Sequence, residues 1–517
     1  MPRPLAFRSS ALRLVACLAA AACTKTEIVF RDREPFNPAP DLASGLLGYY
    51  NADSRQTTCG NCHVGHQADW FATKHANAEQ SLAAITPAPP ATCYGCHTVN
   101  ERGNGLTGAA GWDVVKNDAY KDVQCESCHG PGTEHVKRPD DRSNWPLARI
   151  GMTVADASCA ACHTGIHTPF AEEWAASGHS KVIASPAGRA ECASCHEGKA
   201  TLKAWGVTTN YVEMTSTAHQ PNTCSVCHNP HGSENTAQLR FPIDTPDPEQ
   251  NLCMKCHLRR GEPAPGSYGA RPHAPQGFVV LGTGGYRPLG ANIDSLIGLT
   301  THASVANPRL CAGCHVNSYE VTDPATGNFV FKSTGHLFKP IPCLDAQGRP
   351  SATTTCAYSP PARTFRACTG SGCHATEAIA AGRLAGVRFD IETLAAQIWV
   401  DTDQDETIDA APTDAGYLAI IRRDFPAELT DPAVTPAKGA EFNVRTFGEG
   451  RYANGDKSLG VHNPFLARAL LAANIQELRT AYNLPAPPQL VAERMGQALD
   501  DARRRQPAFF RTTRAMK

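Results

Sequence analysis

Nine cysteine–histidine motifs constrain this chain more than any other feature of its sequence. The eight short ones have the form Cys-x-x-Cys-His: Cys59-Cys62-His63, Cys93-Cys96-His97, Cys125-Cys128-His129, Cys159-Cys162-His163, Cys192-Cys195-His196, Cys224-Cys227-His228, Cys253-Cys256-His257 and Cys311-Cys314-His315. The ninth is stretched to Cys368-Thr-Gly-Ser-Gly-Cys373-His374. The first six begin at intervals of 34, 32, 34, 33 and 32 residues. This near-constant period predicts a repeat architecture, in which each unit needs its neighbours to bury what it exposes.

The spacing inside each motif suits covalent attachment of haem. Two cysteines separated by two residues can form thioethers with the two vinyl groups of one haem, and the adjacent histidine then ligates the iron. Zinc also uses pairs of Cys-x-x-Cys, but it does not require a histidine after every second cysteine. The sequence therefore predicts about nine haems c, with a disulfide beside an incidental histidine as the alternative at Cys368 and Cys373. A zinc or disulfide scaffold is the alternative for the whole set.

Composition agrees with a chain built around such a cofactor. Aromatic residues make up only 7% of the chain, and it contains 42 Gly and 39 Pro. That composition is typical of a loop-rich chain whose own core is thin. The formal net charge of −1 gives no reason to expect a nucleic-acid partner.

The remaining histidines decide whether each haem iron is closed, which means that a second axial ligand occupies its other side. Nine proximal ligands leave 11 of the 20 histidines. Methionine, the ligand that raises haem potentials, occurs only six times. We therefore expect mostly bis-histidine irons, whose distal candidates are His75, His135, His179, His219, His231, His302, His336 and His462. His75 and His179 end matching stretches that begin at Trp70 and Trp174. We predict His66, His167 and His273 as the non-ligands.

The N-terminus predicts export. Arg3, Arg8 and Arg13 precede a short apolar run over residues 14–22, which is too short to span a bilayer. Cys17 and Cys23 are candidates for a lipid anchor, with Cys23 favoured and an ordinary cleaved signal as the alternative. We expect a lipid-anchored protein in the periplasm, at the outer membrane or on the cell surface. In that oxidising compartment, the two leftover cysteines, Cys343 and Cys356, predict a disulfide.

Four parts follow from these patterns: a lipoprotein-type signal peptide at 1–23, a linker at 24–54, a multihaem array at 55–374 and a mainly helical region at 375–517. Apolar spacing predicts helices over 375–400, 463–482 and 487–504, whereas residues 278–286 predict a loop with one short strand. The acidic residues Asp401, Asp403, Asp405 and Asp409 suit calcium. Glu406 and Pro412 break the EF-hand pattern, and a solvated acidic loop is the alternative.

The motifs, the two Trp-to-His stretches and the segment 460–464 (Gly-Val-His-Asn-Pro) resemble multihaem c-type cytochromes of bacteria that respire periplasmic or extracellular acceptors. The resemblance covers most of residues 55–470. It implies coil and short α-helices wrapped around stacked haems, with little β-structure. It also implies an electron conduit that serves redox partner proteins or an extracellular acceptor, and by analogy a homopolymeric filament.

The competing function is an oxidoreductase with one open haem, resembling the nitrite, hydroxylamine or tetrathionate enzymes. Pentahaem nitrite reductases often replace one motif histidine with lysine, and this chain has no Cys-x-x-Cys-Lys motif. The supply of spare histidines also favours a carrier over an enzyme.

Overall fold

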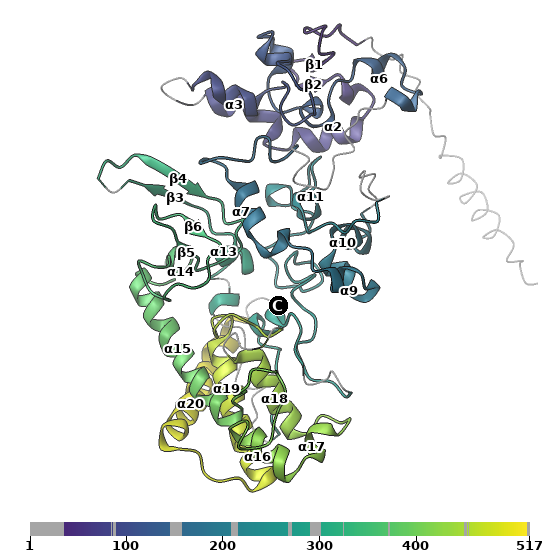
Figure 1. The fold of residues 1–517 in the computed structure, drawn as a ribbon. Helices are drawn as coiled ribbons and strands as arrows, with labels where there is room; N and C mark the ends of the chain where they lie inside the picture. Colours follow the sequence, from purple (N-terminus) through teal and green to yellow (C-terminus); the bar gives the residue numbers. More distant parts are fainter. Residues whose placement is uncertain are drawn as a thin grey trace, which may run out of the picture.

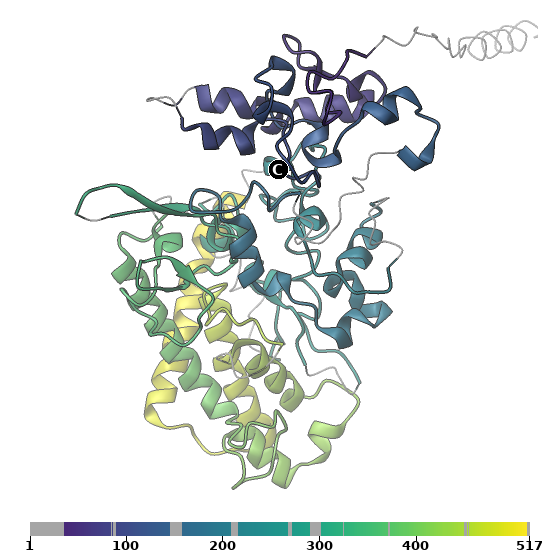
Figure 2. The same ribbon diagram turned by 45° about the horizontal axis from the view of Figure 1, so that its top comes forward.

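The computed structural model describes residues 36–83, 85, 89–144, 158–207, 216–266, 271–289, 301–304, 306–323, 325–370, 373–448, 452 and 454–513. The predicted signal peptide, with Cys17 and Cys23, lies outside these residues. Figures 1 and 2 show an elongated molecule, with the first motifs near one end and the C-terminal helices at the other. None of the described helices is long and apolar enough to cross a membrane.

The motif-bearing region consists of coil and short helices, none longer than eight residues among those described. Frequent Gly and Pro interrupt the chain between motifs, so helices end after one or two turns. The α-helices of this region are α2 (Val64–Phe71), α3 (Ala78–Ala83), α4 (Tyr94–His97), α5 (Cys125–His129), α6 (Thr133–Lys137), α7 (Phe170–Ala176), α8 (Ala184–Ala187), α9 (Ala190–His196), α10 (Gly198–Ala204), α11 (Cys224–Cys227), α12 (Gln276–Val280), α13 (Cys311–His315) and α14 (Arg366–Thr369).

The described strands form three small antiparallel pairs. These are β1 (Tyr49–Asn51) with β2 (Gln56–Thr57), β3 (Tyr319–Thr322) with β4 (Phe329–Ser333), and β5 (Cys343–Leu344) with β6 (Pro350–Ser351). The β3–β4 hairpin pairs Tyr319 with Ser333 and projects from the side of the molecule (Figure 1). The predicted disulfide between Cys343 and Cys356 is confirmed, and it closes the loop that contains β6.

The prediction of a short strand within residues 278–286 was wrong. Residues 276–280 instead form α12, which buries Val279 and Val280. Gly282 and Gly285 follow with positive φ angles, which glycine tolerates better than other residues. The chain therefore turns away after one helical turn instead of extending into a strand.

The C-terminal region is helical, as predicted. Its helices are α15 (Glu377–Ile398), α16 (Tyr417–Asp424), α17 (Ala427–Thr430), α18 (Pro436–Phe447), α19 (Pro464–Tyr482) and α20 (Gln489–Thr513). Side chains of Thr376, Thr435 and Asn463 accept hydrogen bonds from backbone N–H groups at the starts of α15, α18 and α19. Asn483 ends α19 in the left-handed conformation.

The largest hydrophobic cluster of the described chain lies in this C-terminal region. The middle helix α19 buries Leu466, Leu470 and Leu471 completely against α15, α18 and α20. The motif-bearing region has only small clusters, such as the one around Leu46 and Tyr120. The fold class is therefore confirmed: coil and short helices with little strand, followed by a helical region. The described side chains of residues 36–374 do not by themselves fill the interior of the motif-bearing region.

Candidate functional site

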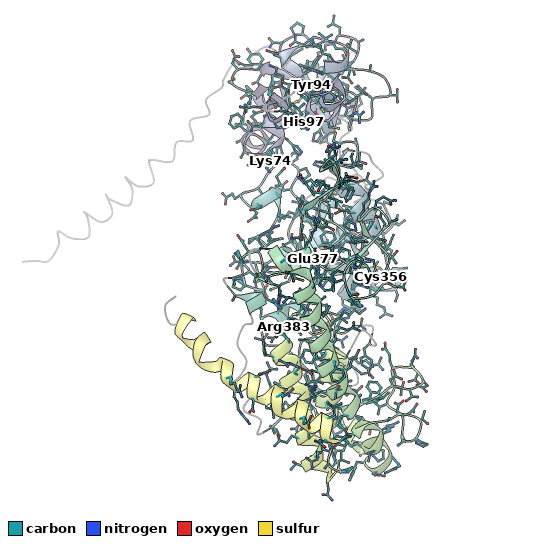
Figure 3. All side chains as sticks on the ribbon, turned by 90° about the vertical axis from the view of Figure 1, so that its left-hand side faces the viewer. Lys74, Tyr94, His97, Cys356, Glu377 and Arg383 are labelled. Carbon is teal, nitrogen blue, oxygen red and sulfur yellow. A yellow bond between two sulfur atoms is a disulfide. The ribbon has the colours of Figure 1, made fainter. Side chains whose placement is uncertain are left out.

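One continuous cavity runs through the motif-bearing region. Its volume is about 5,710 Å³, and its lining includes all 18 motif cysteines and all nine motif histidines. A pocket for one small ligand is typically about 300–1,000 Å³, so this cavity has room for several haem-sized groups. In Figure 3, His97 of the second motif and Glu377, just after the ninth, lie far apart along the long axis. The motifs are thus spread along the molecule.

The motif cysteines are free thiols placed for covalent attachment. None of the 18 forms a disulfide. In α5 and α13 the two cysteines of a motif stand three residues apart on a helix, which puts both on one face. In the described part of the chain, one group of three or more His, Cys, Asp or Glu residues has its ligand atoms within 4.8 Å of one another. That group consists of Asp401, Asp403 and Asp405. The thiols therefore do not converge into the four-ligand clusters that structural zinc requires.

Thiol contacts join different motifs: four of the five contacts connect motifs that are two apart in sequence, and the fifth connects the seventh and eighth motifs. The Cys59 thiol hydrogen-bonds with Cys125, and the same contact joins four further pairs. These pairs are Cys96 with Cys162, Cys159 with Cys224, Cys195 with Cys256, and Cys253 with Cys311. These contacts form three groups, which join the first motif with the third, the second with the fourth and sixth, and the fifth with the seventh and eighth. Cys128 of the third motif lies within electrostatic range of Cys159, and Cys227 of the sixth within range of Cys253, so the three groups are neighbours.

Seven motif histidines face a second histidine across the cavity. Their ring centres are 6.0–6.4 Å apart: His63–His135 (6.4 Å), His129–His231 (6.0 Å), His163–His75 (6.1 Å), His196–His273 (6.1 Å), His228–His336 (6.3 Å), His257–His179 (6.2 Å) and His315–His462 (6.0 Å). An imidazole binds a metal through a bond of about 2 Å. The ring centre lies about 1.1 Å further on, so two rings on opposite sides of one ion stand roughly 6.2 Å apart. The observed separations match that value.

The other predicted ligands divide into two groups. His302 lies near His374, and its pKa is lowered by burial and then, more weakly, by the charges of His374 and His462. His219 is the one histidine of the 20 that does not line the cavity, and all 20 belong to the described residues. His97 lines the cavity without a second histidine ring beside it among the described residues.

Three histidines were predicted as non-ligands, and the structure places one of them opposite a motif histidine. His273 faces His196 at 6.1 Å. His167 instead stacks on Phe329 of β4 at 4.6 Å. His66 lies 6.3 Å from His63, but it follows His63 by only three residues and cannot reach the opposite side of the same haem. Nothing in the sequence around His273 repeats elsewhere, so sequence reasoning had no signal for its position.

Hydrogen bonds donated by Nδ1 leave Nε2 of four imidazoles for a metal. Nδ1 lies 2.7 Å from a backbone carbonyl oxygen in His97 (Ala78), His228 (Ala237) and His302 (Val461). In His315 the corresponding distance to the Phe338 oxygen is 2.9 Å. A carbonyl only accepts, so Nδ1 carries the proton. Metal-binding histidines are typically oriented in this way by the groups behind them.

Burial favours the neutral form of five histidines that line the cavity. Burial, and then the neighbouring histidines, lowers the pKa of His163, His179 and His315 to about 4. Burial also lowers the pKa of His75 and His228. A histidine must be unprotonated at the ligating nitrogen to bind a metal. The donor set, its spacing and its protonation state therefore fit haem iron held between pairs of histidines.

The two Trp-to-His stretches have the same structural role. The indole Nε1 of Trp70 donates to the carbonyl oxygen of Val123, and that of Trp174 donates to Asn222, both at 2.9 Å. Each carbonyl stands two residues before the first cysteine of a later motif, Cys125 or Cys224. The recurring unit thus contains three motifs, a larger period that the match between the stretches already indicated.

Two buried carboxylates connect segments that are far apart in the sequence, and neither of them was identified from the sequence. Glu173 accepts hydrogen bonds from Ser333 Oγ, Thr334 N, Thr334 Oγ1 and His336 N at 2.7–3.0 Å. Glu126, inside the third motif, accepts from Leu47 N, Gly48 N and Gly132 N. The sequence could have indicated Glu173 through its position directly before Trp174, where the second Trp-to-His stretch begins. These contacts fix the segment of His336, which faces His228.

The acidic loop gathers only part of its predicted set. Asp401, Asp403 and Asp405 come together, whereas Asp409 is not in that group. The Asp401 carboxylate accepts from Gln404 N and Glu406 N within the same loop. The loop is held by its own backbone, and the backbone N–H of Asp409 donates instead to Asp414.

Two family models match parts of the chain. The doubled CXXCH motif matches residues 218–261, which contain the sixth and seventh motifs. Cytochrome c554 and c-prime matches residues 58–130, which contain the first three. No solved structure matches the chain.

Similar proteins come from bacteria. The multiheme cytochrome MtrA of Shewanella baltica is 26% identical over 269 residues, which cover 47% of this chain and 71% of that protein. The C-type polyheme cytochrome OmcB of Geobacter sulfurreducens is 25% identical over 302 residues, covering 51% of this chain and 36% of that protein. Cytochrome c-554 of Nitrosomonas europaea is 29% identical over 135 residues, covering 20% and 54%. The chain therefore spans only part of two of these relatives.

Proposed function

Because the chain is a multihaem c-type cytochrome, we propose that it conducts electrons through nine covalently bound haems, most of them closed by two histidines. The observation that carries this proposal is the set of seven histidine pairs with ring centres 6.0–6.4 Å apart. Haem c supplies one-electron redox chemistry when it is bound. The chain supplies the thiols, the imidazoles and the shape that holds them in a row.

The proposed ligand assignment follows the pairs. The motif histidines are the proximal ligands. Their distal partners are His135, His231, His75, His273, His336, His179 and His462 for the first, third, fourth, fifth, sixth, seventh and eighth motifs. We add His302 for the ninth, because it lies near His374 and directs Nδ1 to the Val461 carbonyl, which leaves Nε2 for the iron. Closed irons carry electrons but offer no position to a substrate.

The order of contacts supports a conduit. The thiol contacts join the first eight motifs into three groups, and thiols of neighbouring groups lie within electrostatic range of one another. The Cys314 thiol of the eighth motif likewise lies within electrostatic range of Cys373 of the ninth. Electrons entering near one end would pass along this row to a redox partner protein or an extracellular acceptor. Two relatives are named as multihaem or polyhaem cytochromes, which agrees with this role.

Location and assembly are finer parts of the proposal. Export with a lipid anchor on Cys23 would place the protein in the periplasm, at the outer membrane or on the cell surface. Mass spectrometry of the mature N-terminus tests this, because a Cys23→Ser variant would lose the lipid mass. A homopolymeric filament is a further arrangement, which electron microscopy of the purified protein tests.

Calcium at Asp401, Asp403 and Asp405 stays a prediction that rests on their shared loop. Adding calcium to chelator-treated protein would raise the midpoint temperature of unfolding if the loop binds the ion. An unchanged midpoint would favour the solvated acidic loop.

His97 favours a second candidate function. Its ring has no histidine partner among the described residues, so the iron of the second motif is the one at which an open position is expected. An oxidoreductase of the nitrite, hydroxylamine or tetrathionate type needs such a position. Turnover of one of these substrates, lost in a variant at the second motif, would support this candidate over a simple conduit.

Protein-film voltammetry tests the conduit directly. A conduit of nine haems gives a broad, reversible envelope whose area corresponds to nine electrons per chain, without a catalytic wave. An envelope of one or two electrons would contradict the proposal.

A further inference from the structure

Asp456 is a buried carboxylate in direct contact with a proposed haem ligand. Its side chain is 2% exposed, and its Oδ1 lies 2.6 Å from Nδ1 of His462. His462 in turn faces His315 of the eighth motif at 6.0 Å. Asp456 lies in the segment between α18 and α19, well outside the motifs.

This contact differs in charge from those behind other ligands. His97, His228, His302 and His315 direct Nδ1 to neutral backbone carbonyls. His462 directs it to a carboxylate. The eighth motif thus combines one imidazole backed by a carbonyl, His315, with one backed by a carboxylate.

The surrounding chain holds Asp456 in place. Its backbone N–H donates to the Thr446 carbonyl in α18 at 2.9 Å. Ser458 Oγ donates to its Oδ2, and the Gln276 side chain donates to its carbonyl oxygen. Asn463, the residue after His462, caps α19. The carboxylate is therefore fixed against the imidazole by two helices and one turn.

We propose that Asp456 is a positioning residue, which holds His462 on the iron of the eighth motif and lowers the reduction potential of that haem. The inference rests on the proposed function. A carboxylate that accepts the Nδ1 proton raises the basicity of the imidazole. Ferric haem carries one more positive charge than ferrous haem, so a nearby buried anion stabilises the ferric state.

The position of the eighth motif gives this effect a consequence for electron flow. Cys311 contacts Cys253 of the seventh motif, and Cys314 lies within electrostatic range of Cys373 of the ninth. Electrons that pass between the seventh and ninth haems cross the eighth. A lowered potential there shifts electrons towards the seventh and ninth haems, and so changes the driving force for transfer at this end of the row.

The test is a potentiometric titration of the full-length holoprotein and its Asp456→Asn variant. The ferrous-to-ferric ratio of one haem at a fixed potential should rise roughly tenfold, which is about 59 mV for a one-electron couple. The low-spin EPR signal of that haem should shift as well. Asp414→Asn is the matched control, because Asp414 is equally buried but does not line the cavity. Asp456→Glu should restore most of the wild-type potential.

Ser458→Ala gives a second reading that keeps the carboxylate, and it also removes the acceptor of the His462 backbone N–H. Removal of the Ser458 donor makes Asp456 a stronger acceptor for His462, so the same couple should move downward. Unchanged couples in both variants, with nine haems present, would overturn the inference and leave the conduit standing. A wild-type protein that lacks bis-histidine haems would instead overturn the proposed function. An Asp456→Asn variant that fails to fold leaves Ser458→Ala to decide.

Discussion

The orientation of each imidazole in the cavity is set by what lies behind it. Backbone carbonyls from Ala78, Ala237 and Phe338 accept the Nδ1 protons of three motif histidines. Each of these acceptors lies well outside the motif it serves, so haem attachment and the fold of distant segments depend on each other. Single substitutions behind a ligand should therefore alter one haem at a time.

Removal of one distal histidine should open one iron. In a His179→Ala variant, the iron beside His257 loses its sixth ligand, and we expect one high-spin haem per chain by EPR. His219→Ala is the matched control, because His219 is exposed and does not line the cavity. A His179→Ala spectrum that stays entirely low-spin would remove His179 from the ligand set.

Recurrence explains which ligands could be predicted from the sequence. His75 and His179 stand in matching stretches, and in the structure both face motif histidines. His273 has no such context, and only the chain path brings it opposite His196. His219 has no recurring sequence context either, and it lies away from the cavity. Partners as far apart as His315 and His462, which are 147 residues apart, cannot be paired from spacing.

Short elements in the motif region are joined by buried carboxylates more than by hydrophobic packing. Glu173 in α7 links that helix to β4 and to the segment of His336 through four hydrogen bonds. By contrast, α15, α18, α19 and α20 pack through a continuous apolar core. Two kinds of stabilisation therefore divide the chain between its motif-bearing and C-terminal regions.

A Glu173→Gln variant should destabilise the motif region. In this variant the NH2 group of the amide replaces one carboxylate oxygen and faces groups that donate to that oxygen in the wild type. Those donors lose their acceptor, and we expect the free energy of unfolding to fall by about 3 kcal/mol. Denaturant unfolding followed at the haem Soret band measures this loss. Glu172→Gln is the control: the neighbouring Glu172 is exposed, and its substitution should cost less than about 1 kcal/mol. Equal losses in the two variants would contradict the role of Glu173.

Helices could be predicted where the chain packs on itself. Apolar spacing predicted helices over 375–400 and 463–482, and the structure has α15 over Glu377–Ile398 and α19 over Pro464–Tyr482. The one-turn helices at the motifs carry no such periodicity, because they line a cavity instead of a side-chain core. Their positions depend on contacts made across that cavity.

At the scale of the whole molecule, the cavity takes the place of a core. About 5,710 Å³ lies among residues from the first motif to the ninth, and the small clusters beside it bury few side chains. Bound haems would supply the missing apolar contact area. The sequence predicts how many attachment sites there are, but the side-by-side order of the motifs emerges only from the folded chain.

Folding of residues 36–374 should therefore depend on haem attachment. Chain produced without haem attachment should be digested rapidly within this region by limited proteolysis, while the C-terminal helical region, which has its own core, should resist. Mass spectrometry of the surviving fragments measures the difference. A haem-free chain that is protected throughout would show that the motif region folds on its own.

The central claim is that nine haems are bound and that nearly all are closed by two histidines. The most direct measurement is low-temperature EPR of the oxidised protein, with haem content from the pyridine haemochrome of the same sample. We predict nine haems per chain, with low-spin signals for at least eight and any high-spin signal confined to the second motif. High-spin signals from several haems, or a content well below nine, would contradict the account.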